Sequence, residues 1–277
     1  MHVRVGGVPE HFNLPWILAI EEHLFSHIDI NVEWTDFPGG TGSIMRALEA
    51  GEIDMATPLT EGAITAIANG NPSRLLRPWV DSPLLWGVFV RAGSPIRAIS
   101  ELPTQTDPAA RFAISRIGSG SELMSRVMAQ DLDWTLTDEN FLVVGGLDGA
   151  LEALPSGEAD VFLWNMSMTQ PHVDNGTFDR IDVLATPWPG FSIVATERFL
   201  AENPGVAESA SQVASARAAA LSIDDSAAAI IAERYELEVD GALGWLDQVR
   251  FTPADGLLDL DMVADVERRM RAVGRIS

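Results

Sequence analysis

Short apolar runs alternate along the first part of the chain with longer segments that have helical spacing. The runs VRVGGV, INVEWTDF and IDMATPL have the length of strands, and the segments Leu14–Phe25, SIMRALEAG and EGAITAIANG follow them. A helix places its apolar residues three or four positions apart, whereas a half-buried strand alternates them. The order strand, helix, strand, helix, strand, helix predicts a parallel sheet covered by helices.

The middle of the chain repeats this character, and the last part is helical. The runs LLWGVFVRAG, ARFAISRI, ENFLVVGG and ADVFLWNM are expected to be strands, with helices at SELMSRVMAQ and LDGALEALPSG. From Thr196 onward the pattern predicts helices in FLAENPGVAESASQVASARAAALSI, DDSAAAIIAERYEL and MVADVERRMRAVG. The natural interpretation is a second α/β domain inserted into the first.

Such an insertion needs two crossings, and two extended segments fit: Pro83–Gly93 and Leu184–Ala195. We therefore predict two α/β domains joined by a hinge of two crossings. Domain I comprises residues 1–87 and 188–277, with a helical C-terminal part, and domain II comprises residues 88–187. A ligand is expected to bind in the cleft between them, where strands end and helices begin.

Composition and charge exclude several classes of partner. Forty acidic against eighteen basic residues give a net charge of −22, which disfavours nucleic acid and anionic membranes as partners. No apolar run is long enough for membrane insertion. With 277 residues and a hydrophobic share of 47%, a folded, soluble protein is expected. Met1 leads directly into a strand without a leader, which indicates a cytoplasmic protein, or an exported one whose signal peptide was removed.

The order of several motifs carries a resemblance to a known family. These motifs are VPEHFNLP, GGTGSIMRALEAGEIDMA, LTEG, SPLLWGVFV, RIGSGSELMS, GEADVFLWNMSMTQPHVDNG and TPWPGFSIVAT. In this order they resemble the type II periplasmic-binding-protein fold. They look most like a branch of small, often intracellular, solute-binding-like proteins of fungi and bacteria, related to nitrate-, sulfonate- and taurine-binding proteins and to thiamine-pyrimidine synthases. The resemblance implies a small-molecule ligand and an ABC permease as a possible partner. The chain departs from that branch at Asn165 and Gln170, where glutamate and lysine tend to stand.

Two glycine-rich turns precede helices and offer free backbone N–H groups to an anion. In PGGTGS, residues 38–43, Thr41 and Ser43 can cap the following helix, while Gly42 lets a ligand approach the backbone. A second turn follows the strand FAISRI in domain II. A carboxylate, sulfonate or phosphate would suit such helix starts, although plain capping explains many of them. The candidate ligand-binding residues of the second turn are Gly118, Ser119, Gly120 and Ser121.

Further candidates for the cleft are polar or aromatic residues at strand ends. Thr60 and Glu61 follow the strand IDMA, where they either begin a helix or contact a ligand that carries an amine or ring N–H. Glu10 and His11 form the polar end of the first strand; His11 either packs beside Phe12 or hydrogen-bonds the ligand. The remaining candidates, with core packing as their alternative role, are Trp86, Trp164, Asn165 and Trp188.

Three functions fit these residues. The first is a binding module for a small anionic or zwitterionic molecule, for delivery to a transporter or for sensing. The second is a cofactor-independent lyase, similar to menaquinone-pathway enzymes of this fold, although no catalytic set has a diagnostic spacing. The third is an interaction protein that has lost its ligand.

Cofactor and metal chemistry find little support. All basic residues are arginine and the cysteine count is zero, which excludes pyridoxal-phosphate and cysteine-dependent catalysis. His23 and His27 share a helix face, yet no third metal ligand is evident. No cofactor, metal or catalytic residue is therefore assigned.

Overall fold

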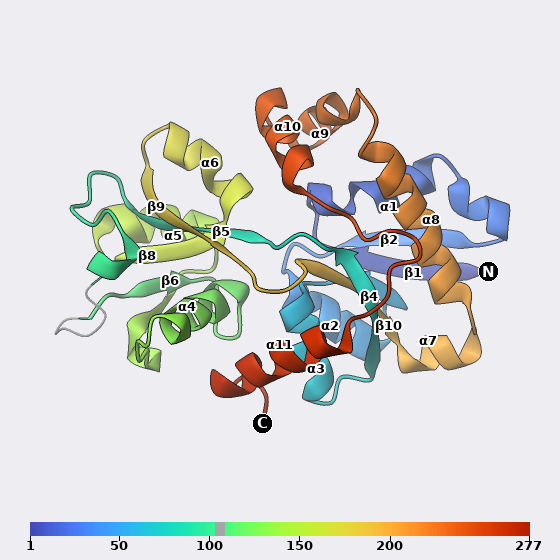
Figure 1. The fold of residues 1–277 in the computed structure, drawn as a ribbon, viewed down its shortest axis with the longest axis horizontal. Coiled ribbons are helices and arrows are strands. Elements are labelled where there is room, and N and C mark those ends of the chain that lie inside the picture. The colour runs from blue at the N-terminus through green and yellow to red at the C-terminus, as the bar shows by residue number, and fades with distance from the viewer. Residues whose placement is uncertain (103–108) are drawn as a thin grey trace. The chain divides into compact units, whose positions relative to one another are not determined.

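A computed structural model describes residues 1–102 and 109–277 of the chain, and Figure 1 shows the fold. The chain divides into two compact units. Unit 1 comprises Met1–Pro83 and Pro187–Ser277, and unit 2 comprises Leu84–Thr186. The domain boundary predicted after residue 87 falls inside strand β5 (Leu85–Arg91), which pairs with both of its neighbours from its first residues onward.

The sheet of unit 1 is mixed and has the strand order β2-β1-β3-β10-β4. Strands β1, β2 and β3 run parallel, whereas β10 runs antiparallel to both β3 and β4. The parallel arrangement predicted for the first three strands is confirmed, and β10, which the sequence placed in a hinge segment, adds an antiparallel strand beside β3. The strand bounds are His2–Gly7 (β1), Asn31–Asp36 (β2), Met55–Thr57 (β3), Ser73–Val80 (β4) and Phe191–Thr196 (β10).

Helices cover both faces of this sheet (Figure 1). Helices α2 and α3 pack through Ile44, Leu48 and Ala63 against Ala56 of β3 and Val194 of β10. Helices α1 and α8 contact each other on the other side (Figure 1). The helical bounds are His11–Asn13 (η1), Leu14–Glu21 (α1), Leu24–Ile28 (η2), Thr41–Ala50 (α2), Thr60–Ala68 (α3), Glu197–Glu202 (α7), Val206–Leu221 (α8), Ala227–Tyr235 (α9), Val239–Gln248 (α10) and Leu260–Ala272 (α11).

Two helices of unit 1 differ from the sequence-based prediction. The helix predicted over Leu14–Phe25 ends at Glu21, because His23 adopts a left-handed conformation with φ 57° that an α-helix does not contain. Helix α10 was not predicted. Its two glycines, Gly241 and Gly244, lower its helix propensity, and its formation rests on tertiary packing of Trp245.

Unit 2 contains a second mixed sheet, of order β7-β6-β8-β5-β9. Strand β6 runs parallel to β7 and β8, and β5 runs antiparallel to β8 and β9. Phe89, Phe162 and Phe178 form its core together with alanines of α5. The remaining bounds are Ile99–Glu101 (η3), Phe112–Ile114 (β6), Gly120–Asp131 (α4), Asp138–Asn140 (η4), Phe141–Val143 (β7), Leu147–Ser156 (α5), Val161–Asn165 (β8), Met166–Asp174 (α6) and Phe178–Ala185 (β9).

Candidate ligand-binding site

The parallel strands of unit 1 end at one edge of the sheet. Strand β1 ends at Gly7, β2 at Asp36 and β3 at Thr57, and helices begin shortly after each of β2 and β3. Helix starts carry unpaired N–H groups and a partial positive charge. This edge therefore has the general properties of an anion-binding surface in an open α/β sheet.

The start of α2 lies directly against the start of α3. The Thr41 Oγ1 atom accepts a hydrogen bond of 3.0 Å from the backbone N–H of Leu59, the N-cap residue of α3. A Cβ atom on Gly62 would lie 2.5 Å from Thr41 Cγ2, so glycine permits this close approach. Contrary to the prediction, neither Thr41 nor Ser43 caps α2; the N-cap is Gly40, and no side chain caps it. The N–H groups at Thr41 and Gly42 thus remain available at the first turn.

Thr60 and Glu61 occupy the first two positions of α3, as the sequence predicts. The Thr60 hydroxyl shares a hydrogen bond of 2.8 Å with the hydroxyl of Ser192 in β10, and both side chains are fully buried. This contact holds α3 to the antiparallel strand beside β3. Ser192 was not predicted as part of the site, because its position in an apolar run gives no sequence signal.

Glu61 is a buried acid whose principal neighbour is a tryptophan. Its Oε2 atom accepts a hydrogen bond of 2.8 Å from Nε1 of Trp188, and only 1% of the glutamate is exposed. Burial raises the pKa of the Glu61 carboxyl to about 7, against the lowering effect of this bond and of the Glu61 backbone N–H. The structure therefore brings together Glu61 and Trp188, which the sequence predicted separately. The Glu61 carboxyl of this pair can take up or release a proton near neutrality.

A second buried hydrogen bond joins the ends of β1 and β3. Thr57 Oγ1 donates to Asn13 Oδ1 at 2.7 Å, and Asn13 Nδ2 donates to the carbonyl of Val8 at 2.8 Å. A Cβ atom on Gly7 would lie 2.6 Å from both side chains. Asn13 and Thr57 were not predicted as site residues. They hold the polar segment after β1 against the end of β3.

Glu10 and His11 follow β1 in the predicted place, but their environments differ. Glu10 is partly buried, and burial raises the pKa of its carboxyl to about 7. His11 is only 1% exposed, and burial lowers the pKa of its imidazole to about 4, so the ring is neutral at pH 7. The imidazole stacks on Phe12 with ring centroids 4.9 Å apart, which is the packing role that the sequence analysis considered.

The C-terminal helices contribute two aromatic residues beside His11 that the sequence analysis missed. Trp245 of α10 packs edge-on at 4.4 Å between ring centroids, and Tyr235 at the end of α9 packs edge-on at 5.8 Å. Burial raises the pKa of the Tyr235 hydroxyl to about 12. Their only signal in the sequence is an aromatic residue in an otherwise small-residue helical segment, which is too weak to locate a partner far away in the chain.

In unit 2, the glycine-rich turn at the start of α4 is closed by its own side chains. Ser119 is the N-cap and its Oγ accepts from the backbone N–H of Glu122 at 3.4 Å, while Ser121 Oγ accepts from Ser115 N at 3.1 Å. The carboxylate of Glu122 accepts from the N–H of Gly118 at 2.7 Å. The Glu122 side chain therefore already occupies part of this helix start. At the first turn, the N–H groups of Gly120 and Ser121 are the ones that remain for a ligand.

The remaining candidates of unit 2 lie on neighbouring strands. Trp86 in β5 pairs in register with Asn165 at the end of β8; it is 4% exposed, and its Nε1 has no hydrogen-bond partner in the described part of the chain. Trp164 stacks on Phe162 at 5.2 Å between ring centroids. Asn165 Oδ1 accepts from Met168 N at 3.5 Å, at the start of α6. Gln170, the other position where the sequence departs from the branch that it resembles, bonds Asp174 and Arg180.

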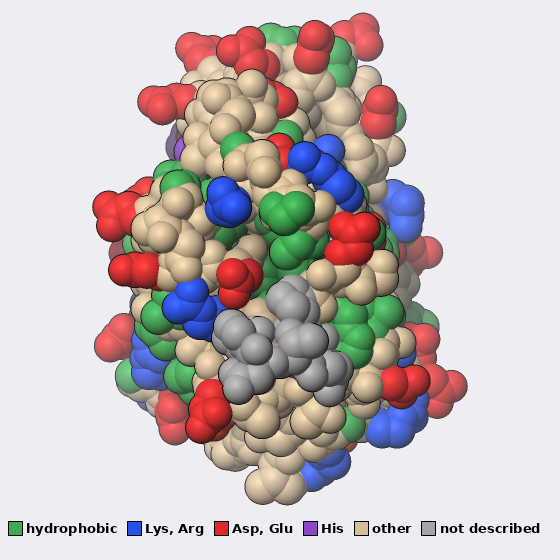
Figure 2. All heavy atoms as spheres, turned by 90° about the vertical axis from the view of Figure 1, so that its left-hand side faces the viewer, with side chains coloured by type: hydrophobic (Ala, Val, Ile, Leu, Met, Phe, Trp, Pro, Cys, Tyr) green, Lys and Arg blue, Asp and Glu red, His purple; other side chains and the backbone are tan. Residues whose placement is uncertain are grey.

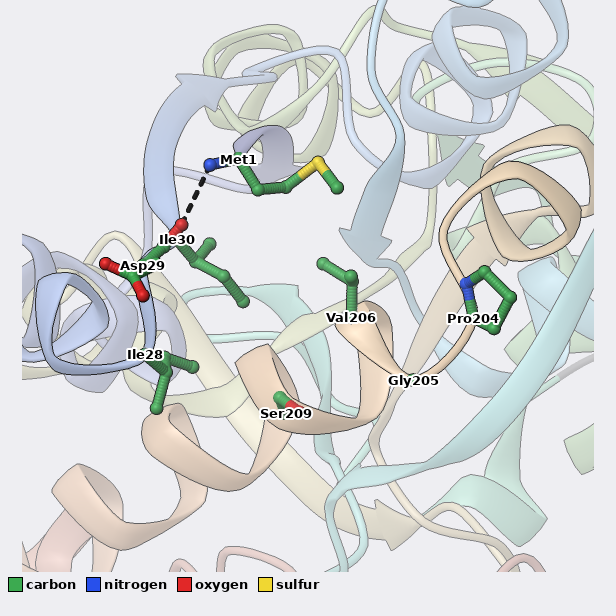
Figure 3. A pocket seen from close by; sticks show the side chains of 8 residues that line it. All are labelled: Met1, Ile28, Asp29, Ile30, Pro204, Gly205, Val206 and Ser209. Atoms are coloured by element: carbon green, nitrogen blue, oxygen red, sulfur yellow. Dashed lines mark hydrogen bonds between the residues drawn. The ribbon is translucent and has the colours of Figure 1, made fainter.

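A pocket of about 430 Å³ lies elsewhere in unit 1 (Figure 3). Figure 3 shows side chains from the end of η2 facing the first turn of α8 across it. None of the predicted site residues lines it. Its lining consists of Met1, Ile28, Asp29, Ile30, Pro204, Gly205, Val206 and Ser209.

The described residues contain neither a cluster of metal ligands nor a membrane-spanning helix. Within residues 1–102 and 109–277, no group of three or more His, Asp or Glu side chains is arranged to hold a metal ion. Over the same ranges, no helix combines the length and the apolar character that crossing a bilayer requires. On the face shown in Figure 2, acidic side chains are spread widely with arginines between them, and no basic patch is formed.

Comparison with known proteins relates this architecture to solute-binding proteins. A model of the Ca3427-like PBP family matches residues 90–184, and no curated protein matches the chain. The structure is similar to that of the Candida albicans CA3427 gene product, described as having the generic periplasmic binding protein fold. The two are 26% identical with a TM-score of 0.87, over 99% of this chain and 90% of that one.

Two structures with bound ligands are also similar. The alkanesulfonate-binding protein SsuA from Xanthomonas axonopodis pv. citri, bound to MOPS, is 18% identical with a TM-score of 0.74, over 100% of this chain and 94% of that one. PhnD1 from Prochlorococcus marinus, in complex with methylphosphonate, is 13% identical with a TM-score of 0.66, over 99% of both chains. With its two mixed five-stranded sheets flanked by helices, the chain thus has the type II periplasmic-binding-protein fold, as its sequence motifs predicted.

Proposed function

We propose that this protein is a solute-binding protein for a small organic oxyanion, either anionic or zwitterionic. The observation that carries the proposal is the contact between two helix starts at one sheet edge, where Thr41 Oγ1 accepts from Leu59 N at 3.0 Å. The N–H groups of Thr41 and Gly42 are left for an anion at the start of α2, and the adjacent start of α3, whose Leu59 and Thr60 N–H groups are already bonded, adds its partial positive charge. A single hydrogen bond to a charged group contributes about 1.5 to 3 kcal/mol, so two of them supply about 3 to 6 of the roughly 8 kcal/mol that micromolar binding requires, and further contacts must supply the rest.

The relatives support the oxyanion class. An alkanesulfonate-binding protein and a complex with methylphosphonate share this fold. Sulfonate, phosphonate and carboxylate groups all present several acceptor oxygens, and backbone N–H groups bind each of them. These donors need no lysine, which this chain lacks.

The buried Glu61 and the partly buried Glu10 favour a ligand that carries a cationic group as well. Burial raises the carboxyl pKa values of Glu61 and Glu10 to about 7. An ammonium group beside either carboxylate would form an ion pair with it and offset the free-energy cost of burying the negative charge. An amino-sulfonate or amino-phosphonate combines both features. We therefore rank a zwitterion above a simple anion.

The roles of unit 2 and of a partner protein stay predictions. The turn from Gly118 to Ser121, with Trp86, Trp164 and Asn165, is expected to provide the second half of the site. Delivery to an ABC permease and sensing both follow from such binding. Genes for a permease and an ATPase beside the gene for this chain would favour delivery.

Calorimetric titration with ethanesulfonate, 2-aminoethanesulfonate and methylphosphonate tests the proposal. Gly42→Glu places a carboxylate in the first turn of α2, where it stabilises the helix but competes with an anionic ligand. Leu260→Glu is a matched control, because it puts the same charge at the first residue of α11, on a side chain that is 72% exposed.

We expect at least one of the three compounds to bind the wild-type protein. Gly42→Glu should weaken that binding tenfold or more, and Leu260→Glu should leave it unchanged. The proposal is wrong if none of the three compounds binds, or if both variants bind as the wild type does.

A further inference from the structure

His11 lies in an aromatic cluster that links the first strand to the C-terminal helices. Its imidazole contacts Phe12 at 4.9 Å, Trp245 at 4.4 Å and Tyr235 at 5.8 Å between ring centroids. Phe12 in turn contacts Phe191 of β10 at 4.8 Å. The segment after β1, the strand beside α3 and the helices α9 and α10 therefore meet at one place in unit 1.

Two polar atoms of this cluster are buried without a partner. Neither His11 Nε2 nor Trp245 Nε1 has a hydrogen-bond partner among the described residues, although both atoms are closed to solvent. By contrast, Trp79 Nε1 donates to the carbonyl of Phe12 at 3.0 Å, and Trp188 Nε1 donates to Glu61. In folded proteins the great majority of buried polar groups have a hydrogen-bond partner, because a buried group without one has lost its hydrogen bond to water and gained nothing in return. Two orphans on rings in contact therefore point to a binding partner from outside the chain.

The helices α9 and α10 pack against each other as a hairpin, residues 227–248, whose Tyr235 and Trp245 rings contact the imidazole of His11. At its outer side an ion pair of 2.9 Å joins Arg234 to Glu21, and both side chains are more than one-third exposed. Exposed ion pairs contribute little to stability. Val239 and Leu243 of α10 are each 48% exposed, so a large part of each apolar side chain faces solvent. Near His11 the hairpin makes the ring contacts of Tyr235 and Trp245, while Ile231 and Ala242 of the same two helices are fully buried.

We propose that this hairpin is a lid over the ligand site, and that Trp245 Nε1 and His11 Nε2 hydrogen-bond one oxygen of the bound oxyanion once the lid has opened to admit it. The inference rests on the proposed function and adds a second anchoring point to the helix starts of α2 and α3. An indole N–H only donates, so its partner must be an acceptor oxygen. The imidazole, which is neutral at pH 7, also donates from Nε2 in one of its two tautomers.

Replacing Trp245 by phenylalanine tests the anchoring pair. The Trp245→Phe variant keeps an aromatic ring but removes the indole N–H and makes the buried ring smaller, so the melting temperature should fall, as it does for large-to-small substitutions in a core. Trp16→Phe is the matched control, because Trp16 Nε1 is also buried without a described partner but its ring contacts Phe25, Trp34 and Trp79 instead of His11. Affinities are measured calorimetrically with ethanesulfonate and 2-aminoethanesulfonate.

We expect Trp245→Phe to weaken binding about tenfold, as the loss of one hydrogen bond to a charged group predicts, and Trp16→Phe to bind as the wild type does. If Trp245→Phe binds normally while Gly42→Glu binds poorly, the lid inference is wrong and the proposed function stands. If the wild-type protein binds neither compound, both proposals are wrong.

Hydrogen exchange of the intact protein tests the lid itself. Saturating ligand should slow amide exchange across residues 227–248, because both anchoring bonds then hold the hairpin closed. Equal exchange rates in this hairpin with and without ligand would contradict the proposal. Exchange in α8 serves as the internal reference, since this helix packs against α1 and carries no residue of the proposed site.

Discussion

Single buried carboxyls make the stability of this protein depend on pH. For Glu61 the folded-state pKa of about 7 lies above the ordinary value of 4.5. Below pH 4.5 the folded and unfolded states are both protonated, so the group has no effect. Between pH 4.5 and 7 only the folded state holds the proton, and the free energy of unfolding falls as pH rises; above pH 7 the loss is complete.

Glu61→Gln should therefore remove much of this fall. The neutral amide oxygen still accepts from Trp188, and no charge is buried at high pH. We expect the variant to be more stable than the wild type at pH 8, by about 1 to 3 kcal/mol, and close to it at pH 4.5. Urea unfolding at both pH values measures the difference, and an equal pH dependence in the two proteins would contradict the assignment to Glu61.

The buried bond between Thr57 and Asn13 makes a second prediction at the residue scale. Thr57→Val keeps the shape of the side chain but leaves the Asn13 Oδ1 atom buried without its donor at 2.7 Å. An orphaned buried acceptor costs about 1 to 3 kcal/mol, and urea unfolding at pH 5 should show that loss. Thr177→Val is the control, because its hydroxyl bonds Asn175 at the exposed end of a turn; a loss of similar size there would show that the effect is not specific to the buried pair.

At the scale of elements, the contact between α2 and α3 depends on a glycine. An alanine Cβ at position 62 would lie 2.5 Å from Thr41 Cγ2, so the two helix starts must move apart. Overpacking of this kind costs about 1 to 3 kcal/mol. We expect Gly62→Ala to lower stability and to weaken oxyanion binding.

Gly241→Ala is the matched substitution in another helix. Gly241 lies inside α10 with open space where a Cβ would stand, so alanine there should raise the free energy of unfolding by about 0.5 to 1 kcal/mol. Chemical denaturation of both variants measures the contrast. Equal effects would mean that helix propensity, and not the contact with Thr41, governs position 62.

At the scale of the whole molecule, the net charge of −22 acts on stability through self-repulsion. Salt screens this repulsion over a Debye length of about 10 Å at 0.1 M. We expect the melting temperature to rise by a few degrees between 0.02 and 0.5 M NaCl. A fall would show instead that attractive pairs, such as Arg4 with Asp54 at 2.6 Å, dominate the electrostatic free energy.

The sequence by itself determined the class of fold and the start of most functional elements. Alternating apolar runs and helical spacing are local properties, and hydrophobic burial translates them directly into strands and helices. Hence Thr60 and Glu61 begin α3, and the turn from Gly118 to Ser121 leads into α4, where the pattern placed them. The direction of β10 could not be predicted from the sequence, because the pattern of apolar residues in a strand is the same whether its neighbour runs parallel or antiparallel to it.

Only the tertiary structure decided which side chains meet. Trp188 lies 127 residues from Glu61 along the chain and donates to it, although eight tryptophans were available as partners. Tyr235 and Trp245 close over His11 from helices whose sequence shows mainly small residues. Such contacts depend on how packed elements bring distant positions together. Periodicity describes only which face of an element is buried, and it does not specify the residue that buries it.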